Sequence, residues 1–267
     1  MTKRTKSREE TLTMLLRTLK LPSFAACYEE TAARGEREGW TFGQYLSHLA
    51  ELEIADRSER KVARLLKQSG LPAEKTLATL DSKKVPTKVA RLLPSLCEGG
   101  FLARATNILA FGLPGRGKTH LVCAIGHELI RRGHPVLFTP TYVLVQRLLA
   151  AKRDLALERE LHRLDRFEAV ILDDIGYVQQ DRDEMEVLFT FLAQRYERRS
   201  VIITSNLVFS QWDRIFKDPM TTAAAIDRLV HHSTIIDMTG PSIRSQEALK
   251  KEPPSKGSGT KTTPPSA

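Results

Sequence analysis

The sequence predicts an α/β fold, in which a parallel sheet is flanked by helices and preceded by an all-helical N-terminal region. Between residues 105 and 240, short continuous apolar runs alternate with segments of helical periodicity. This alternation is typical of buried parallel strands joined by helices on both faces of a sheet. Residues 1–100 instead show only helical spacing of apolar side chains. We therefore divide the chain into a helical region over 1–100, an α/β domain over 101–245 and a tail over 246–267.

The longest helix of the N-terminal region is predicted over residues 42–69. Thr41 and Gln44 have the spacing of a capping box, in which each side chain bonds the backbone N–H of the other residue. Apolar side chains follow at helical intervals, and Gly70 and Pro72 then end the helix. Two shorter helices are expected to precede it, near residues 8–20 and 23–34.

The same helix carries five basic residues whose spacing puts them on one face, namely Arg57, Arg60, Lys61, Arg64 and Lys67. Two interpretations of this face remain open. It is either a solvated surface or a contact with nucleic acid or with an acidic partner. We assign the helical region a role in binding a partner or DNA.

In the α/β region the predicted elements alternate between strands and helices. Apolar runs predict five strands, over residues 106–111, 135–139, 168–173, 200–205 and 234–237. Helical periodicity predicts three helices between them, over residues 120–132, 141–153 and 182–198. Because the strands are apolar throughout rather than alternating, both faces of the sheet should be covered.

Charge and composition favour a nucleic-acid partner and a disordered C-terminal tail. The chain of 267 residues has a formal net charge of +9. A basic protein of this kind can bind nucleic acid, because neutralising phosphates releases counterions. The tail over 246–267 is rich in Pro, Ser, Gly and Thr and poor in large apolar residues, so we expect it to be disordered.

Three further features indicate a cytoplasmic protein without a membrane partner. The sequence contains no apolar stretch of roughly 18 residues, which a membrane-spanning helix would need. Its N-terminus, MTKRTKSREE, lacks the apolar core of a secretory signal. Cys27, Cys97 and Cys123 are far apart and form no C-x-x-C pair, so they indicate reduced thiols rather than a disulfide framework or a zinc site.

A phosphate-binding motif follows the first predicted strand. Residues Gly112–Thr119, GLPGRGKT, match the pattern G-x-x-x-x-G-K-[ST] between an apolar strand and a helix. The glycines let the backbone approach phosphates, successive N–H groups point inward, and the helix directs its positive end at the same anion. Lys118 is expected near the β- and γ-phosphates, and the Thr119 hydroxyl at a metal ion. We expect ATP to contact the loop and the first helical residue, that is Gly112, Leu113, Pro114, Gly115, Arg116, Gly117, Lys118, Thr119 and His120.

Polar residues at the ends of two later strands complete the predicted site. Asp173 ends a buried apolar run, and with Thr119 it is the predicted ligand of Mg²⁺, which prefers oxygen donors. Asp174 would orient or deprotonate the attacking water. Asn206, at the end of the next strand, would hold that water or the γ-phosphate. The alternative interpretations are a solvated turn for the two acids and a strand-end cap for Asn206.

On these residues, the segment 105–244 resembles the ATPase domain of the IstB-like transposition helper family, relatives of the DnaC helicase loader within the AAA+ ATPases. The resemblance is carried by GLPGRGKTHL, AVILDDIGY, QRYERRSVIITSN, QWDRIFKDP and AIDRLVHHSTII. Residues from Leu19 to about Leu80 resemble the helical N-terminal region of the same family, notably in LKLPSFAACYEE. The nucleotide motifs mark only the superfamily, whereas their combination with TSN and DRLVHH is more specific.

The resemblance implies a nucleotide pocket between subunits. Arg228 is similar to the arginine that reaches the γ-phosphate bound by a neighbouring subunit, and Arg244 to the sensor arginine that contacts phosphate in its own subunit. The implied function is that of an ATP-dependent transposition helper. Such a protein forms a homo-oligomeric ring or spiral on double-stranded DNA, regulates or recruits the cognate transposase, and disassembles on hydrolysis. The implied catalytic residues are Lys118, Asp174, Asn206, Arg228 and Arg244.

Some features leave alternatives open. Many AAA+ proteins have Asp-Glu where this chain has Asp173-Asp174, and the shorter side chain reduces the reach of residue 174 to water. This departure keeps open a DNA-binding module in which ATP is only structural. The other rival functions are a DnaC-like helicase loader, which shares the same core, and a P-loop kinase of small molecules. The tail beyond Lys250 matches nothing in the family pattern. His231 and His232 are adjacent, so on a helix their side chains would not share one face and could not bind a metal together. We interpret them as packing or surface residues rather than as metal ligands.

Overall fold

The computed structural model of the chain describes residues 3–177, 182–207, 211–212 and 219–238. The chain divides into two compact units, one of Met1–Gly70 with Ile130–Pro135, and one of Leu71–Leu129 with Val136–Ala267. This division differs from the predicted one at residue 100, because the segment 71–100 belongs to the unit that contains the sheet. The predicted tail over 246–267 lies outside the described residues.

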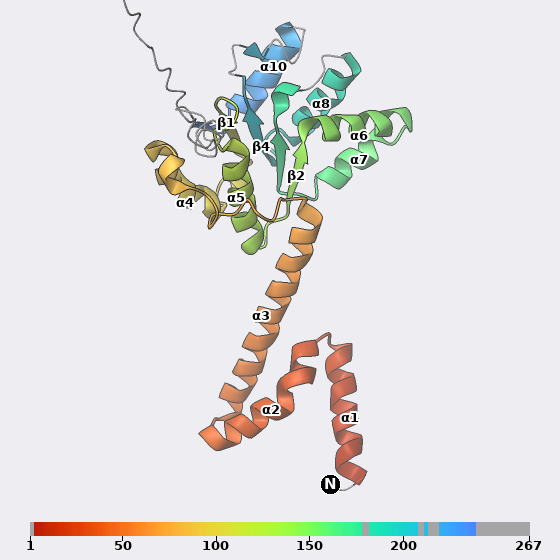
Figure 1. Cartoon of the computed structure of the whole chain (residues 1–267). Coiled ribbons are helices and arrows are strands. Elements are labelled where there is room, and N and C mark those ends of the chain that lie inside the picture. The colour runs from red at the N-terminus through yellow and green to blue at the C-terminus, as the bar shows by residue number, and fades with distance from the viewer. Residues whose placement is uncertain (1–2, 178–181, 208–210, 213–218, 239–267) are drawn as a thin grey trace, which may run out of the picture. The chain divides into compact units, whose positions relative to one another are not determined.

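Three helices lie in the Met1–Gly70 part of the first unit (Figure 1). They are α1 (Lys3–Thr18), α2 (Pro22–Glu38) and α3 (Phe42–Ser69). The capping box at the start of α3 is present: the Thr41 hydroxyl accepts from the Gln44 N–H, and the Gln44 side chain accepts from the Thr41 N–H at 2.8 Å. At the other end Gly70 adopts a left-handed φ of 67°, which ends the helix without the strain a Cβ would cause. The predicted span of α3 is therefore confirmed.

Helix α2 is anchored to α3 through a buried carboxylate. Glu53, 3% exposed, accepts hydrogen bonds from the Ser23 N–H at 2.8 Å and from Arg57 Nε at 2.7 Å. Burial of the carboxylate works against its charge, but these hydrogen bonds outweigh burial and hold the pKa of Glu53 below its ordinary value. The negative charge also lies at the positive N-terminal end of α2, which is favourable.

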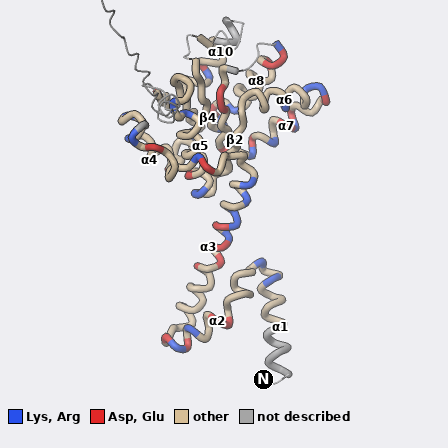
Figure 2. The backbone as a smooth tube through the Cα atoms, in the orientation of Figure 1, with Lys and Arg blue, Asp and Glu red and all other residues tan. Residues whose placement is uncertain are grey.

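The basic face of α3 is partly occupied by ion pairs within the chain. Figure 2 shows Lys and Arg gathered on the C-terminal half of α3, with acidic residues between them. Arg57 pairs with Glu53, and Arg60 pairs with Asp56 at 2.8 Å. Two of the five basic residues on this face are therefore engaged with carboxylates of α3 itself. Contact of the face with nucleic acid stays a prediction.

The second unit contains a five-stranded parallel sheet of order β2-β3-β4-β1-β5 (Figure 1). Its strands are β1 (Asn107–Phe111), β2 (Val136–Pro140), β3 (Ala169–Asp173), β4 (Ser200–Ser205) and β5 (Ser233–Asp237). Its helices are α4 (Thr87–Glu98), α5 (Lys118–Arg131), α6 (Thr141–Arg153), α7 (Leu157–Leu164), α8 (Arg182–Arg195) and α10 (Pro219–Val230). Short 3₁₀ turns span Ser82–Lys84, Leu102–Arg104 and Ile175–Tyr177. The predicted α/β class and all five predicted strands are confirmed.

Alternate residues of each strand point to opposite faces of the sheet and are covered by different helices. Val170 and Leu172 of β3 belong to a core shared with α6, α7, α8 and α10. Ile171 points the other way, and its Cδ1 lies 2.9 Å from the position that a Cβ on Gly126 of α5 would occupy. Helix α5 can therefore pack this closely against the sheet only because residue 126 has no side chain.

A buried arginine bonds the backbone at the N-terminal ends of β3 and β4. Arg195, 1% exposed, donates hydrogen bonds to the carbonyl oxygens of Leu164, Phe167 and Ser200 at 2.9–3.2 Å. Burial lowers the pKa of Arg195 to about 10, while Asp165 at 3.8 Å acts in the opposite direction. These contacts fix the starts of the two strands whose far ends carry the candidate site.

Within the described residues, no helix is both long enough and apolar enough to cross a membrane.

Candidate nucleotide-binding site

The loop Gly112–Gly117 joins the end of β1 to the start of α5 in a backbone conformation that requires glycine. Gly112, Gly115 and Gly117 have φ values of 151°, 75° and 81°. A Cβ on Gly112 would also lie 2.7 Å from the carbonyl oxygen of Met238, which is too close for any side chain. The loop leads directly to the N-terminus of a 14-residue helix. This arrangement presents backbone N–H groups and the positive end of the helix to an anion.

Lys118 lies under this loop and links it to the end of β4. The side chain is 6% exposed. Its ammonium donates to the carbonyl oxygens of Gly112 and Leu113 at 2.6 and 3.1 Å, and to Asn206 Oδ1 at 2.6 Å. The structure thus brings together two predicted site residues that are 88 positions apart in the sequence.

Oxygen donors converge on Asp173 at the end of β3. Its Oδ1 accepts from the hydroxyl of Thr119 at 2.8 Å and from that of Thr204 at 2.7 Å. The Thr141 hydroxyl donates to the Asp173 backbone oxygen at 3.0 Å and so fixes the strand end. A carboxylate beside a hydroxyl is a set of hard oxygen donors that suits Mg²⁺, with phosphate and water oxygens left to complete an octahedron.

Asp174 points to a different partner from Asp173, as expected for adjacent residues. It has a left-handed φ of 63°, a conformation that Asp and Asn tolerate better than most residues. Its N–H donates to the Thr204 hydroxyl at 2.8 Å, and its carboxylate accepts from Asn206 Nδ2 at 2.8 Å. Since Asn206 receives a hydrogen bond from Lys118 on its oxygen and gives one to Asp174 from its nitrogen, only one orientation of its amide satisfies both partners.

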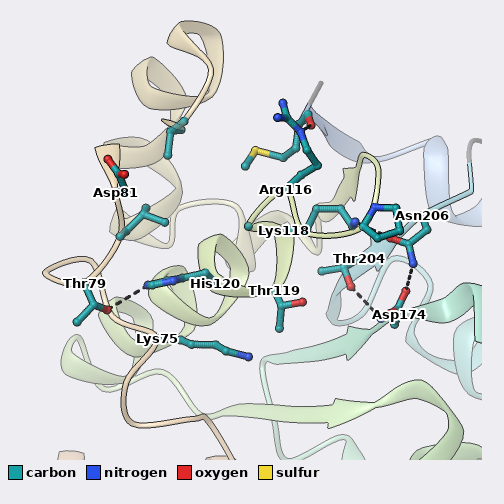
Figure 3. A pocket seen from close by; sticks show the side chains of 16 residues that line it. Lys75, Thr79, Asp81, Arg116, Lys118, Thr119, His120, Asp174, Thr204 and Asn206 are labelled. Atoms are coloured by element: carbon teal, nitrogen blue, oxygen red, sulfur yellow. Dashed lines mark hydrogen bonds between the residues drawn. The ribbon is translucent and has the colours of Figure 1, made fainter. Parts of the chain in front are cut away.

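Most of these side chains border a cavity of about 330 Å³ (Figure 3), although Asp173 is not among its lining residues and reaches it only through Thr119 and Thr204. One wall is the phosphate loop with Lys118 and Thr119, and another carries Asp174, Thr204 and Asn206. The sequence interpretation missed a third wall from the segment before the sheet, formed by Lys75, Thr79, Leu80, Asp81 and Val85. Figure 3 shows Thr79 and His120 pointing at each other across this wall, with Thr79 Oγ1 and His120 Nε2 3.1 Å apart.

Arg116 belongs to the loop, but its guanidinium is directed at the end of β5. The residue is 6% exposed, and its Nε donates to the Met238 carbonyl oxygen at 2.9 Å. The Met238 N–H in turn donates to the Phe111 carbonyl oxygen at 2.8 Å. The loop is therefore anchored at both of its ends to the backbone of one residue that follows β5.

Of the two arginines proposed for the γ-phosphate, the structure describes only Arg228, which lies away from the cavity. Arg228 of α10 is not among the residues that line the cavity, and its guanidinium stacks 4.8 Å above the ring of Phe189. Among the described residues its Nη1 has no hydrogen-bond partner, although this atom is buried. Arg244 lies outside the described residues.

The adjacent histidines have a third neighbour that their sequence spacing could not indicate. Glu197 lies close enough that one ligand atom from each of Glu197, His231 and His232 falls within 4.8 Å of the others. All three side chains are exposed. Their contacts are an ion pair of 3.5 Å between His232 and Glu197, and a hydrogen bond of 3.1 Å between Tyr196 and His231.

In sequence, the chain is similar to known ATP-binding proteins. Residues 14–251 match the family model described as IstB-like ATP binding protein. A protein of Sinorhizobium fredii that carries the name insertion sequence ATP-binding protein is 44% identical over 91% of this chain and 82% of its own length. The ATP-binding protein named for insertion sequence IS21 of Pseudomonas aeruginosa is 35% identical over 90% of each chain. The crystal structure of DnaI superposes with a TM-score of 0.53 and 21% identity, over 64% of this chain and 96% of that chain, which shows a shared fold.

Proposed function

Because this chain belongs to the family of IstB-like ATP binding proteins, we propose that it is an ATPase that assists DNA transposition. The observation that carries the proposal is the hydrogen-bonded set at the carboxyl ends of β1, β3 and β4. There Lys118 contacts Asn206, Asn206 contacts Asp174, and Thr119 contacts Asp173. A phosphate loop, a metal-side acid and a water-side acid are the components that ATP hydrolysis requires.

Each residue has a distinct part in the proposed reaction. The backbone N–H groups of Gly112–Gly117 and the start of α5 bind the phosphates, and Lys118 neutralises charge near the β- and γ-phosphates. Asp173 and Thr119 would hold Mg²⁺, which supplies charge stabilisation at the phosphate oxygens when bound. Asp174 orients water and accepts its proton, and Asn206 holds Asp174 in place through the 2.8 Å hydrogen bond.

Asp174 is one methylene shorter than the glutamate common at this position in AAA+ proteins. Its left-handed backbone and its hydrogen bond from Asn206 fix the carboxylate within the cavity wall. We therefore expect slow turnover with unimpaired nucleotide binding. Slow turnover suits a protein whose ATP-bound assembly has to persist while a partner is engaged.

Beyond the single chain, we propose that ATP promotes assembly of subunits into a ring or spiral on double-stranded DNA, which then recruits or regulates the cognate transposase in the cytoplasm. The insertion-sequence names of the relatives and the net charge of +9 support this proposal. Arg228 would complete the site of the neighbouring subunit, consistent with its position away from the cavity of its own chain. The helices before residue 70 would contact the transposase.

A mixing experiment tests the assembly proposal directly. Lys118→Ala should lose turnover but still supply Arg228, whereas Arg228→Ala should bind ATP but fail to complete its neighbour's site. Neither variant alone should release phosphate at an appreciable rate with duplex DNA, and an equal mixture should regain part of the wild-type rate. The control mixes Arg228→Ala with the double variant that lacks both side chains, and no activity should return. If the first mixture stays inactive while wild type turns over, Arg228 does not act across subunits.

The choice of DNA and the reaction product separate the rival functions. A transposition helper should release inorganic phosphate faster with duplex DNA than with single strands, while a helicase loader should prefer single strands. A kinase should transfer phosphate to an acceptor instead. A module with structural ATP should bind nucleotide and show equal background turnover for wild type and Lys118→Ala.

A further inference from the structure

A segment that precedes the sheet runs along helix α5 toward the phosphate loop. We name residues 71–80 the strap. At its start, the Leu71 side chain lies 3.2 Å from the position of a Cβ on Gly126, and the Pro72 carbonyl oxygen is 3.0 Å from His127 Nε2. Near its end, the Thr76 carbonyl oxygen is 3.1 Å from His120 Nε2. The strap therefore descends α5 by two turns and ends beside the residue that follows Thr119.

Hydrogen bonds within the strap hold its turn in one conformation. The Lys75 N–H donates to the Pro72 carbonyl oxygen at 3.2 Å. The Thr79 hydroxyl donates to the Glu74 carbonyl oxygen at 2.6 Å and accepts from the Thr76 N–H at 3.0 Å. Together with His120, these contacts fix the backbone of Lys75 relative to the phosphate loop.

The side chain of Lys75 enters the cavity as a second lysine. It is half-buried and lines the cavity wall. In Figure 3 it extends below His120, with its ammonium directed to the side where Thr119 and Asp174 lie.

The Lys75 ammonium has no hydrogen-bond or ion-pair partner among the described residues. By contrast, the Lys118 ammonium already has three acceptors, namely Gly112, Leu113 and Asn206. Lys75 is partly buried and lines the cavity, so an anionic ligand bound there would interact favourably with its ammonium. The ligand that the cavity is built to accept is a chain of phosphates, which carries more negative charge than Lys118 alone can balance.

We propose that Lys75 is a second phosphate-binding lysine, which contacts the polyphosphate chain of the nucleotide beside Thr119 while Lys118 contacts it from the loop. The strap presents this ammonium, and His120 holds the strap against α5. This role of Lys75 rests on the proposed nucleotide site. It adds a phosphate-binding residue from the strap to those of the motif Gly112–Thr119.

The test compares binding of ATP, ADP and adenosine to wild type and to Lys75→Met, which keeps the aliphatic stem but removes the charge. Dissociation constants are measured by calorimetry with magnesium, at two salt concentrations. Lys75→Met should raise the dissociation constants for ATP and ADP by about tenfold, which corresponds to the loss of one charge-assisted hydrogen bond. The dissociation constant for adenosine should stay unchanged. Lys75→Arg should recover most of the affinity. The matched control is Lys83→Met. This substitution removes the same charge, but from an exposed residue that does not line the cavity.

Two results would overturn the proposal. One is wild-type affinity of Lys75→Met for ATP, which would show that the ammonium touches no phosphate. The other is an equal loss for ATP and adenosine, which would show that Lys75 only shapes the strap. Failure of the nucleotide site itself would look different, because wild type and Lys118→Ala would then both fail to bind ATP. Thermal unfolding of each variant checks that Lys75→Met is folded.

Discussion

Individual side chains at the strand ends have roles that the structure makes separable. The Asp173 carboxylate accepts hydrogen bonds from two hydroxyls, whereas the Asp174 carboxylate accepts one from an amide. The backbone of Asp174 is in the left-handed conformation. The first arrangement suits a metal ligand, and the second suits a base that faces water. The adjacency of the two acids in sequence predicted that they diverge, but not that Thr204 would bridge them.

Asp174→Asn should bind ATP like wild type but hydrolyse it at least about 100-fold more slowly, since general-base catalysis contributes about that much. Asparagine is suitable because it tolerates the left-handed φ of 63° and can still accept from Asn206. Phosphate release and ATP affinity are measured on the same preparation. Unchanged turnover would remove Asp174 from the reaction, and a parallel loss of affinity would indicate a binding role instead.

Arg195 is predicted to stabilise the fold rather than to take part in catalysis. Arg195→Met should lower the free energy of unfolding by about 3 kcal/mol, because it leaves several buried carbonyl groups without a donor. Arg198→Met is the control: Arg198 is 59% exposed and bonds Asp165, so its loss should cost less than about 1 kcal/mol. Denaturant titration of both variants checks the difference, and equal stabilities would contradict the account.

Among the elements, those defined by local signals were predicted well. Helix α3 begins and ends where its capping box and Gly70 indicated, and the five strands follow continuous apolar runs. Helices α4, α7 and α10 were missed. Helix α4 contains Pro94, and α7 has only eight residues. The strap was missed because its position depends on contacts with His120, Gly126 and His127 that no local pattern encodes.

The junction of α2 and α3 should be sensitive to acid. The pKa of Glu53 is lowered in the folded chain, so its charge contributes stability above the ordinary pKa of about 4.5, and this contribution is lost as pH falls through the folded value. The protection factors of the first α2 amides in the full chain, which correct for the pH dependence of intrinsic exchange, should therefore fall below about pH 4.5. In Glu53→Gln they should already be lower at pH 7, by the equivalent of about 1–3 kcal/mol.

The exposed Glu51 of the same helix provides the control, and Glu51→Gln should exchange like wild type. If Glu53→Gln exchanges like wild type at every pH, the carboxylate does not anchor α2.

At the scale of the whole molecule, the residues of the site come from positions between 75 and 238 and meet at the carboxyl ends of the strands of a parallel sheet. The sequence located most of them because the ends of parallel strands carry recognisable polar residues. It located Arg228 and Arg244 only through the family resemblance, and their roles remain proposals that concern neighbouring subunits and the part of the chain beyond the described residues. No local pattern pointed to Lys75, which reaches the same cavity from the strap.

The most direct test of the account is the affinity of the purified, full-length protein for ATP with magnesium, measured beside Lys118→Ala and the exposed-site control Lys83→Ala. Wild type and Lys83→Ala should bind saturably and alike. Lys118→Ala should bind ATP about 10-fold to 100-fold more weakly, as expected for loss of a charge-assisted contact to phosphate. Absence of saturable binding by the folded wild type, or equal binding by Lys118→Ala, would contradict the claim that Gly112–Thr119 holds a nucleotide.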